Sequence, residues 1–148
     1  MSPGRRKARR QAVIILYQQD LLGLSPVAAL ERNEDGNLDD YTRALVLGVG
    51  ENATVIDTVL RPHVTGWSLE RLGVLERSIL RLGTFELLFE PGVPAAVVID
   101  EAVELAKRFC SDEAGALING ILGSLAVSRA EEIAKIRDTG SPRGESGR

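Results

Sequence analysis

Five basic residues fall within six positions near the start of the chain: Arg5, Arg6, Lys7, Arg9 and Arg10. The arginine side chain presents a planar set of N–H donors that matches phosphate oxygens and also stacks on unpaired bases. If this segment is helical, Arg6, Arg9 and Arg10 lie on one side of the helix and the other two flank it. The spacing therefore predicts a cationic stripe that follows a single nucleic-acid strand. Taken alone, a solubilising chain terminus explains these residues equally well.

The distribution of charge favours the binding interpretation more than the total does. The formal net charge of the 148-residue chain is only −3. The basic cluster holds five of the 18 basic residues, so the rest of the chain carries 13 basic against 21 acidic residues, a net charge of −8. Such segregation is typical of a protein with one surface for a polyanion and another for a basic partner.

Catalytic and metal chemistry have few candidates in this sequence. His63 and Cys110 are its sole histidine and cysteine, and glycine-rich phosphate-binding loops are missing. Cys110 has no second thiol for a disulfide or a zinc site, which is typical of a reducing compartment. Asp100, Glu101 and Glu104 are explained by a solvated helix face. We therefore expect no enzyme, no cofactor and no metal, and a cytoplasmic protein without a membrane span or secretion signal.

Hydrophobic periodicity predicts an all-α fold that positions the basic cluster on its first helix. Ser25-Pro26 is a typical helix start, and we expect Pro94 to occupy the first position of a later helix. The expected helices run from the basic cluster to residue 22, from 26 to 32, from 39 to 61, from 69 to 89 as two helices or one kinked helix, from 94 to 109, and from 112 to at least 125. Residues 138–148 lack core-forming side chains, so we expect a disordered tail after a single domain over 1–137.

Two local patterns need separate interpretation. The β-branched residues over 95–99 resemble a buried strand, but the run continues without a break into a helical period, so we expect a helix. Asn119-Gly120 lies inside the last helical stripe although this pair usually marks a turn. We expect the glycine to allow close approach of a neighbouring helix, with approach of a ligand as the alternative.

Several stretches of the chain resemble the NusB family of transcription antitermination factors. The matching stretches are Arg5-Arg6-Lys7-Ala8-Arg9, Ala12-Val13, Leu16-Tyr17, Leu75-Glu76-Arg77, Ile79-Leu80-Arg81, Phe85-Glu86-Leu87, Val93-Pro94, the run from Ile99 to Lys107, and Ile118-Asn119-Gly120-Ile121-Leu122. They occur in the family's order and spacing from about residue 5 to residue 125. The resemblance implies a single domain of about seven helices arranged as two packed helical subdomains.

The resemblance also implies partners and site residues. NusB-like proteins pair with NusE, a ribosomal protein, and bind the single-stranded boxA element of nascent RNA, acting indirectly on the transcribing RNA polymerase complex at ribosomal RNA operons. By position, the implied RNA-binding residues are Arg5, Arg6, Lys7, Arg9, Arg10, Glu113, Leu117 and Asn119. The implied NusE-binding residues are Tyr17, Glu70 and Glu76.

This chain departs from the family pattern at one place. Ala116-Leu117 stand where the family usually has a basic and an aromatic residue, so a stacking contribution on the order of 1 to 3 kcal/mol per base is missing. Two other functions fit a NusB-like bundle: the RNA-binding module of a ribosomal RNA cytosine methyltransferase, and a homodimeric protein-interaction module. The first needs a cofactor-binding α/β domain after residue 138, so we expect it only if the sequence is a fragment, and the second leaves the basic cluster without a role. The family's free forms include both monomers and homodimers.

Overall fold

The computed structural model describes the backbone of residues 3–66 and 68–146, and the side chains of residues 5–66 and 68–132. In these segments the backbone forms seven α-helices and two 3₁₀-helices, and no strand occurs there. The α-helices are α1 (Pro3–Leu22), α2 (Pro26–Arg32), α3 (Asp40–Glu51), α4 (Ala53–Leu60), α5 (Val74–Phe89), α6 (Ala95–Phe109) and α7 (Asp112–Ser146). The 3₁₀-helices are η1 (Arg61–His63) and η2 (Leu69–Arg71). The all-α prediction is confirmed, including the helix over 95–99.

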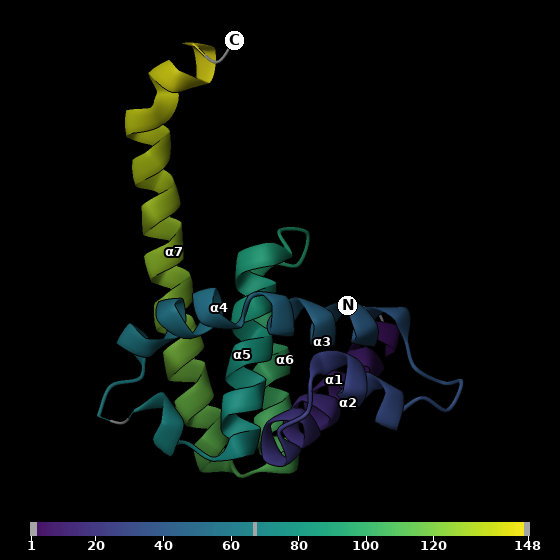
Figure 1. The fold of residues 1–148 in the computed structure, drawn as a ribbon. Helices are drawn as coiled ribbons and strands as arrows, with labels where there is room; N and C mark the ends of the chain where they lie inside the picture. The colour runs from purple at the N-terminus through teal and green to yellow at the C-terminus, as the bar shows by residue number, and fades with distance from the viewer. Residues whose placement is uncertain (1–2, 67, 147–148) are drawn as a thin grey trace.

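The helices form two groups that share α5. Helices α1, α2 and α3 pack on one another, and α4, α6 and α7 each contact α5 (Figure 1). Because α5 also contacts α1 and α3, it carries buried residues on nearly every position from Ser78 to Glu86. The two helical subdomains predicted from the resemblance are therefore present, joined through one central helix.

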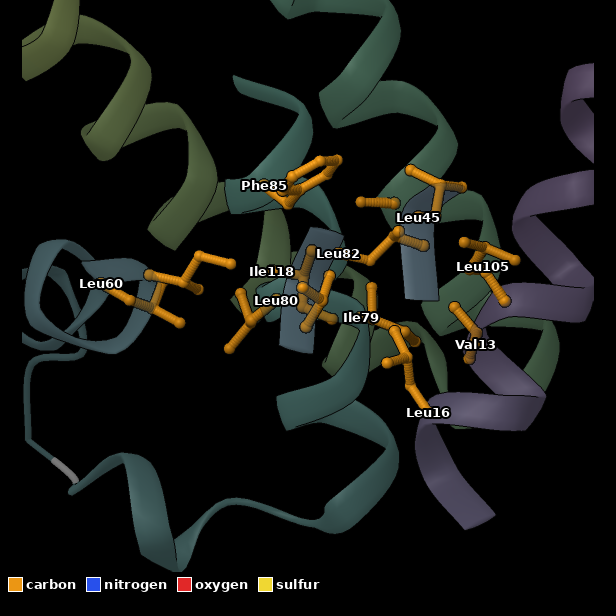
Figure 2. Close-up of a cluster of buried hydrophobic side chains, with 14 of the residues drawn as sticks. Val13, Leu16, Leu45, Leu60, Ile79, Leu80, Leu82, Phe85, Leu105 and Ile118 are labelled. Atoms are coloured by element: carbon orange, nitrogen blue, oxygen red, sulfur yellow. The ribbon is translucent and has the colours of Figure 1, made fainter. Parts of the chain in front are cut away.

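A continuous hydrophobic core connects these groups. Val13 and Leu16 of α1 point toward Ile79 of α5, and Leu105 of α6 and Leu45 of α3 lie close by (Figure 2). Full burial of each such side chain contributes about 1.5 to 3 kcal/mol, so the core holds α1 firmly against α5 and α6. The rigid body therefore fixes the direction of the basic cluster at the start of α1.

Local capping explains where several helices begin. Ser25 accepts a hydrogen bond from the Ala28 amide at 3.1 Å, with Pro26 in the first helical position, as predicted. Asp39 caps α3 by accepting a bond from the Tyr41 amide at 3.0 Å. Pro94 is the N-cap residue of α6 and adopts an extended conformation, so this helix begins one residue later than predicted.

Two further helix boundaries differ from the prediction. The expected helix over 39–61 is broken at Asn52, whose side-chain amide donates to the Gly48 carbonyl at 2.8 Å and so ends α3. The expected helix start at residue 69 is replaced by η2, and α5 begins after Gly73. Gly83 causes no break in α5. A Cβ atom at this position would lie 2.7 Å from Leu122 Cδ1. The glycine is needed for close packing of α5 on α7.

The last helix extends beyond the body of the molecule (Figure 1). Where the sequence predicts a disordered tail over 138–148, the backbone of α7 continues as a helix to Ser146, and residues 147 and 148 lie outside the described part. Elongating a formed helix adds one hydrogen bond per ordered residue, so a helix can continue without a core beside it. Within the described residues, no single helix is long and apolar enough to cross a membrane, although α1 from Arg5 and α2, which meet at 117°, pass that test when combined.

Candidate nucleic-acid interface

The helical geometry of α1 sends its five basic side chains to different environments. Arg9 is buried, with 1% of its side chain exposed. Arg5 and Arg10 are partly buried, whereas Arg6 and Lys7 are exposed. The cluster is therefore not a uniform cationic stripe, because one of its members lies inside the protein.

Arg9 is held by a carboxylate from the central helix. Its Nε lies 2.9 Å from Glu86 Oε1 and its Nη2 lies 2.7 Å from Glu86 Oε2. The Tyr41 hydroxyl donates to the same Oε2 at 2.6 Å. Burial lowers the pKa of Arg9, but the hydrogen bonds and charge of Glu86 outweigh it and the net shift is upward. Burial and the same carboxylate raise the pKa of Tyr41. This cluster ties α1, α3 and α5 together.

The burial of Arg9 changes the role assigned to it from the sequence. The Arg9 side chain is 1% exposed and donates hydrogen bonds to both oxygens of the Glu86 carboxylate. Its N–H groups are therefore not presented to an RNA strand outside the protein. We therefore leave Arg9 out of the proposed RNA surface and assign it a structural role. One signal in the sequence pointed to this cluster: Glu86 is a charged residue inside the apolar run from Leu82 to Phe89.

Arg5 and Arg6 are both oriented by side chains of other helices. The guanidinium carbon of Arg5 lies 3.7 Å from the centre of the Tyr41 ring, a cation–π arrangement. Arg6 donates from Nε and Nη2 to the two oxygens of Glu101, at 3.2 and 2.9 Å. The Glu101 carboxylate raises the pKa of Arg6, first through these hydrogen bonds and then through its charge. Tyr41 and Glu101 were not predicted as parts of the site.

Lys7 and Arg10 complete the outer face of the cluster. Among the described side chains, neither forms an ion pair with a carboxylate. Arg10 lines a cleft of about 160 Å³ between α1 and α6, together with Arg6, Glu101, Glu104, Leu105 and Arg108. This outer face can attract a polyanion, since no described carboxylate forms an ion pair with Lys7 or Arg10.

The predicted RNA-binding residues of α7 lie apart from the basic cluster in sequence but on exposed or partly exposed positions. Glu113 and Asn119 are exposed, and Leu117 is half-buried against the core. Gly120 is also exposed, and a Cβ atom there would meet no atom within 4 Å. The expected close helix packing at Gly120 is therefore wrong, and the approach of a ligand at this position stays a prediction.

The three predicted partner-binding residues have different surroundings. The Glu70 carboxylate accepts bonds from Arg61, with Nη2 2.6 Å from Oε2, and the hydrogen bonding from Arg61 lowers its pKa to about 2. Glu76 stands in the first turn of α5 with its carboxylate against Gly73. Tyr17 is half-buried on α1, where Ile14 and Leu21 are 41% and 56% exposed at helical spacing from it. The exposed Ile14 and Leu21 were not predicted from the sequence, although their three- and four-residue spacing from Tyr17 is visible there.

This fold and site define a class: small all-helical proteins with a cationic helix terminus on an otherwise acidic body. The pattern of the NusB family matches residues 6–127. The chain belongs to the NusB family.

Individual relatives agree with this assignment. The transcription antitermination protein NusB of Nocardioides sp. (strain ATCC BAA-499 / JS614) is 42% identical over 124 residues, covering 82% of this chain and 92% of the relative. The structure of T. maritima NusB is 37% identical, with a TM-score of 0.78, and 85% of this chain and 92% of that chain are covered. A structure of the antitermination factors NusB and NusE in complex with double-stranded RNA contains a chain that is 30% identical, with a TM-score of 0.76, over 86% of this chain and 99% of that one.

Proposed function

We propose that this chain is a transcription antitermination factor that binds boxA-type single-stranded RNA together with NusE and supports transcription of ribosomal RNA operons. The observation that carries the proposal is the outer face of α1, where Lys7 and Arg10 keep unpaired charges among the described side chains. The buried pair of Arg9 and Glu86 holds this face on a rigid helix. Membership of a family whose relatives carry the same function supports it.

In this proposal the chain works as a scaffold without catalysis. Phosphate contacts from Arg5, Arg6, Lys7 and Arg10 give affinity that does not depend on sequence. Glu113, Leu117 and Asn119 of α7 form the second part of the RNA surface. NusE completes the base-reading surface, and the transcribing RNA polymerase complex is an indirect partner.

In this proposal the NusE surface lies on α1 around Tyr17 and at the start of α5. Tyr17 lies between the exposed Ile14 and Leu21, and large apolar side chains at the centre of a patch are typical of protein interfaces. Glu76 provides an acidic group for a basic partner. Glu70 contributes less, because Arg61 already neutralises it. The free protein then exists in the cytoplasm as a monomer or as a homodimer.

A titration of fluorescently labelled boxA RNA tests the proposal, first with the protein alone and then with NusE present. We expect weak binding by the protein alone and tighter, sequence-dependent binding by the NusE complex. A scrambled RNA of the same length is the control, and its affinity should rise less when NusE is added. Equal affinity for both RNAs in the presence of NusE would contradict the proposal. Light scattering on the same samples distinguishes monomer, homodimer and NusE complex.

A further inference from the structure

The pair formed by Arg6 and Glu101 joins the exposed start of α1 to the interior face of α6. The Arg6 side chain is 56% exposed, whereas that of Glu101 is only 9% exposed. The two residues are 95 positions apart in sequence and share two hydrogen bonds. One member of the pair therefore faces the RNA surface and the other lies beneath it.

We infer that Glu101 is an internal competitor for RNA phosphate, which holds Arg6 as a fixed hydrogen-bond donor while cancelling most of its charge toward the RNA. This inference rests on the RNA-binding function proposed above. It divides the basic residues outside the core into two kinds: Lys7 and Arg10 act as full cations, and Arg6 acts as a neutralised donor.

The burial of Glu101 explains why Arg6 stays in the pair. If Arg6 moved away to an RNA phosphate, it would leave a nearly buried carboxylate without its hydrogen-bonding partner, which is strongly unfavourable. Arg6 does not need to move, because the guanidinium has five N–H donors and only two are used by Glu101. Three N–H groups are left for a phosphate oxygen, but that phosphate also meets the negative charge of Glu101 behind the guanidinium.

Glu104 provides a matched control for this effect. It lies one helical turn after Glu101, lines the same cleft with Arg6 and Arg10, and contributes to the electrostatic field at Arg6. It is exposed, and no ion pair joins it to a described side chain. Removing the charge of Glu104 therefore changes the electrostatic potential at this surface but leaves the ion pair between Arg6 and Glu101 intact.

The test is a double-mutant cycle on RNA affinity measured over a range of KCl concentrations with labelled boxA RNA. Glu101→Gln keeps an oxygen that accepts from Arg6 but removes the charge. We expect it to tighten RNA binding roughly threefold to tenfold at low salt and to increase the magnitude of the salt slope by about 0.7, the value for one additional cation on a single strand. In an Arg6→Gln background the increase in salt slope should disappear, because no cation is released there, and Glu101→Gln should then act only as the removal of a negative charge, as Glu104→Gln does.

A second comparison does not depend on the Glu101 variant. Arg6→Gln should weaken binding and leave the salt slope almost unchanged, whereas Lys7→Gln should reduce the slope by about 0.7. The inference is overturned if Glu101→Gln behaves like Glu104→Gln in both backgrounds, if it weakens RNA binding, or if Arg6→Gln lowers the slope as much as Lys7→Gln. A wild-type protein that binds no RNA, alone or with NusE, would overturn the proposed function itself, so the two failures are distinguishable.

Discussion

Arg9 of α1 and Glu86 of α5 form a buried ion pair in which Nη2 lies 2.7 Å from Oε2 and the two side chains are 1% and 2% exposed. The pair anchors the first helix to the central helix directly beneath the exposed basic residues. Tyr41 of α3 bonds the same carboxylate and also supports Arg5 with its ring. The interior cluster thus positions the surface that we propose for RNA.

Removal of one member of this pair should destabilise the whole fold. We expect Arg9→Ala to lower the free energy of unfolding by about 3 to 5 kcal/mol, because it leaves Glu86 buried without its cation. Arg61→Ala, which breaks the solvent-exposed pair with Glu70, is the control and should change the free energy of unfolding far less than Arg9→Ala does. Urea unfolding followed by circular dichroism measures both. Similar small losses for the two variants would show that the buried pair is not an anchor.

The raised pKa of Tyr41 predicts a loss of stability at alkaline pH. The neutral phenol is favoured in the folded state, so its contribution is present below the ordinary tyrosine pKa of about 10 and is lost as the pH rises toward the higher folded-state pKa. We expect the free energy of unfolding to fall above about pH 10, and to fall less steeply in Tyr41→Phe. Urea titrations between neutral and alkaline pH measure this difference. Parallel curves for the two proteins would contradict the assignment.

Helical periodicity predicted most of the fold because it depends on residues close in sequence. Ser25-Pro26 marked the start of α2, and the apolar spacing from Ala114 to Leu125 marked α7. The break at Asn52 was missed because no proline or positive-φ glycine accompanies it. The site was harder to predict, because the partners of Arg9 and Arg6 are 77 and 95 positions away. Composition shows that five charges are present, but only the packing of α1 on α5 and α6 decides which of them reach the surface.

Two glycines inside helices should respond to substitution in opposite ways. Gly48→Ala should destabilise the fold by about 1 to 3 kcal/mol, because the new methyl group would overlap the Phe85 ring. Gly120→Ala should leave stability unchanged or raise it by up to about 1 kcal/mol, since its Cβ meets no neighbour. If the RNA backbone approaches α7 at this point, Gly120→Ala should nevertheless weaken RNA binding. Thermal unfolding and RNA titration of the same samples test the two expectations separately.

The proposed NusE surface, around Tyr17 on α1 and Glu76 on α5, should determine the affinity for NusE without affecting the fold. We expect Leu21→Asp to weaken the NusE complex at least tenfold, because it places a charge in the centre of a proposed apolar contact. Glu76→Lys should also weaken the complex, by reversing a charge that we propose to face the basic partner. Val127→Asp, at a 59% exposed position on α7, is the control for a charge added elsewhere. Calorimetry with NusE measures all three, and undiminished affinity in Leu21→Asp would place the partner on another face.

The salt dependence of RNA binding tests the central claim most directly, namely that Lys7 and Arg10 attract the RNA as full cations. The wild-type protein and a Lys7→Gln, Arg10→Gln double variant are titrated with labelled boxA RNA at several KCl concentrations. We expect the double variant to fold normally, to bind more weakly at low salt, and to lose about 1.4 from the magnitude of the salt slope, the value for two cations on a single strand. An unchanged slope in a folded double variant would contradict the account.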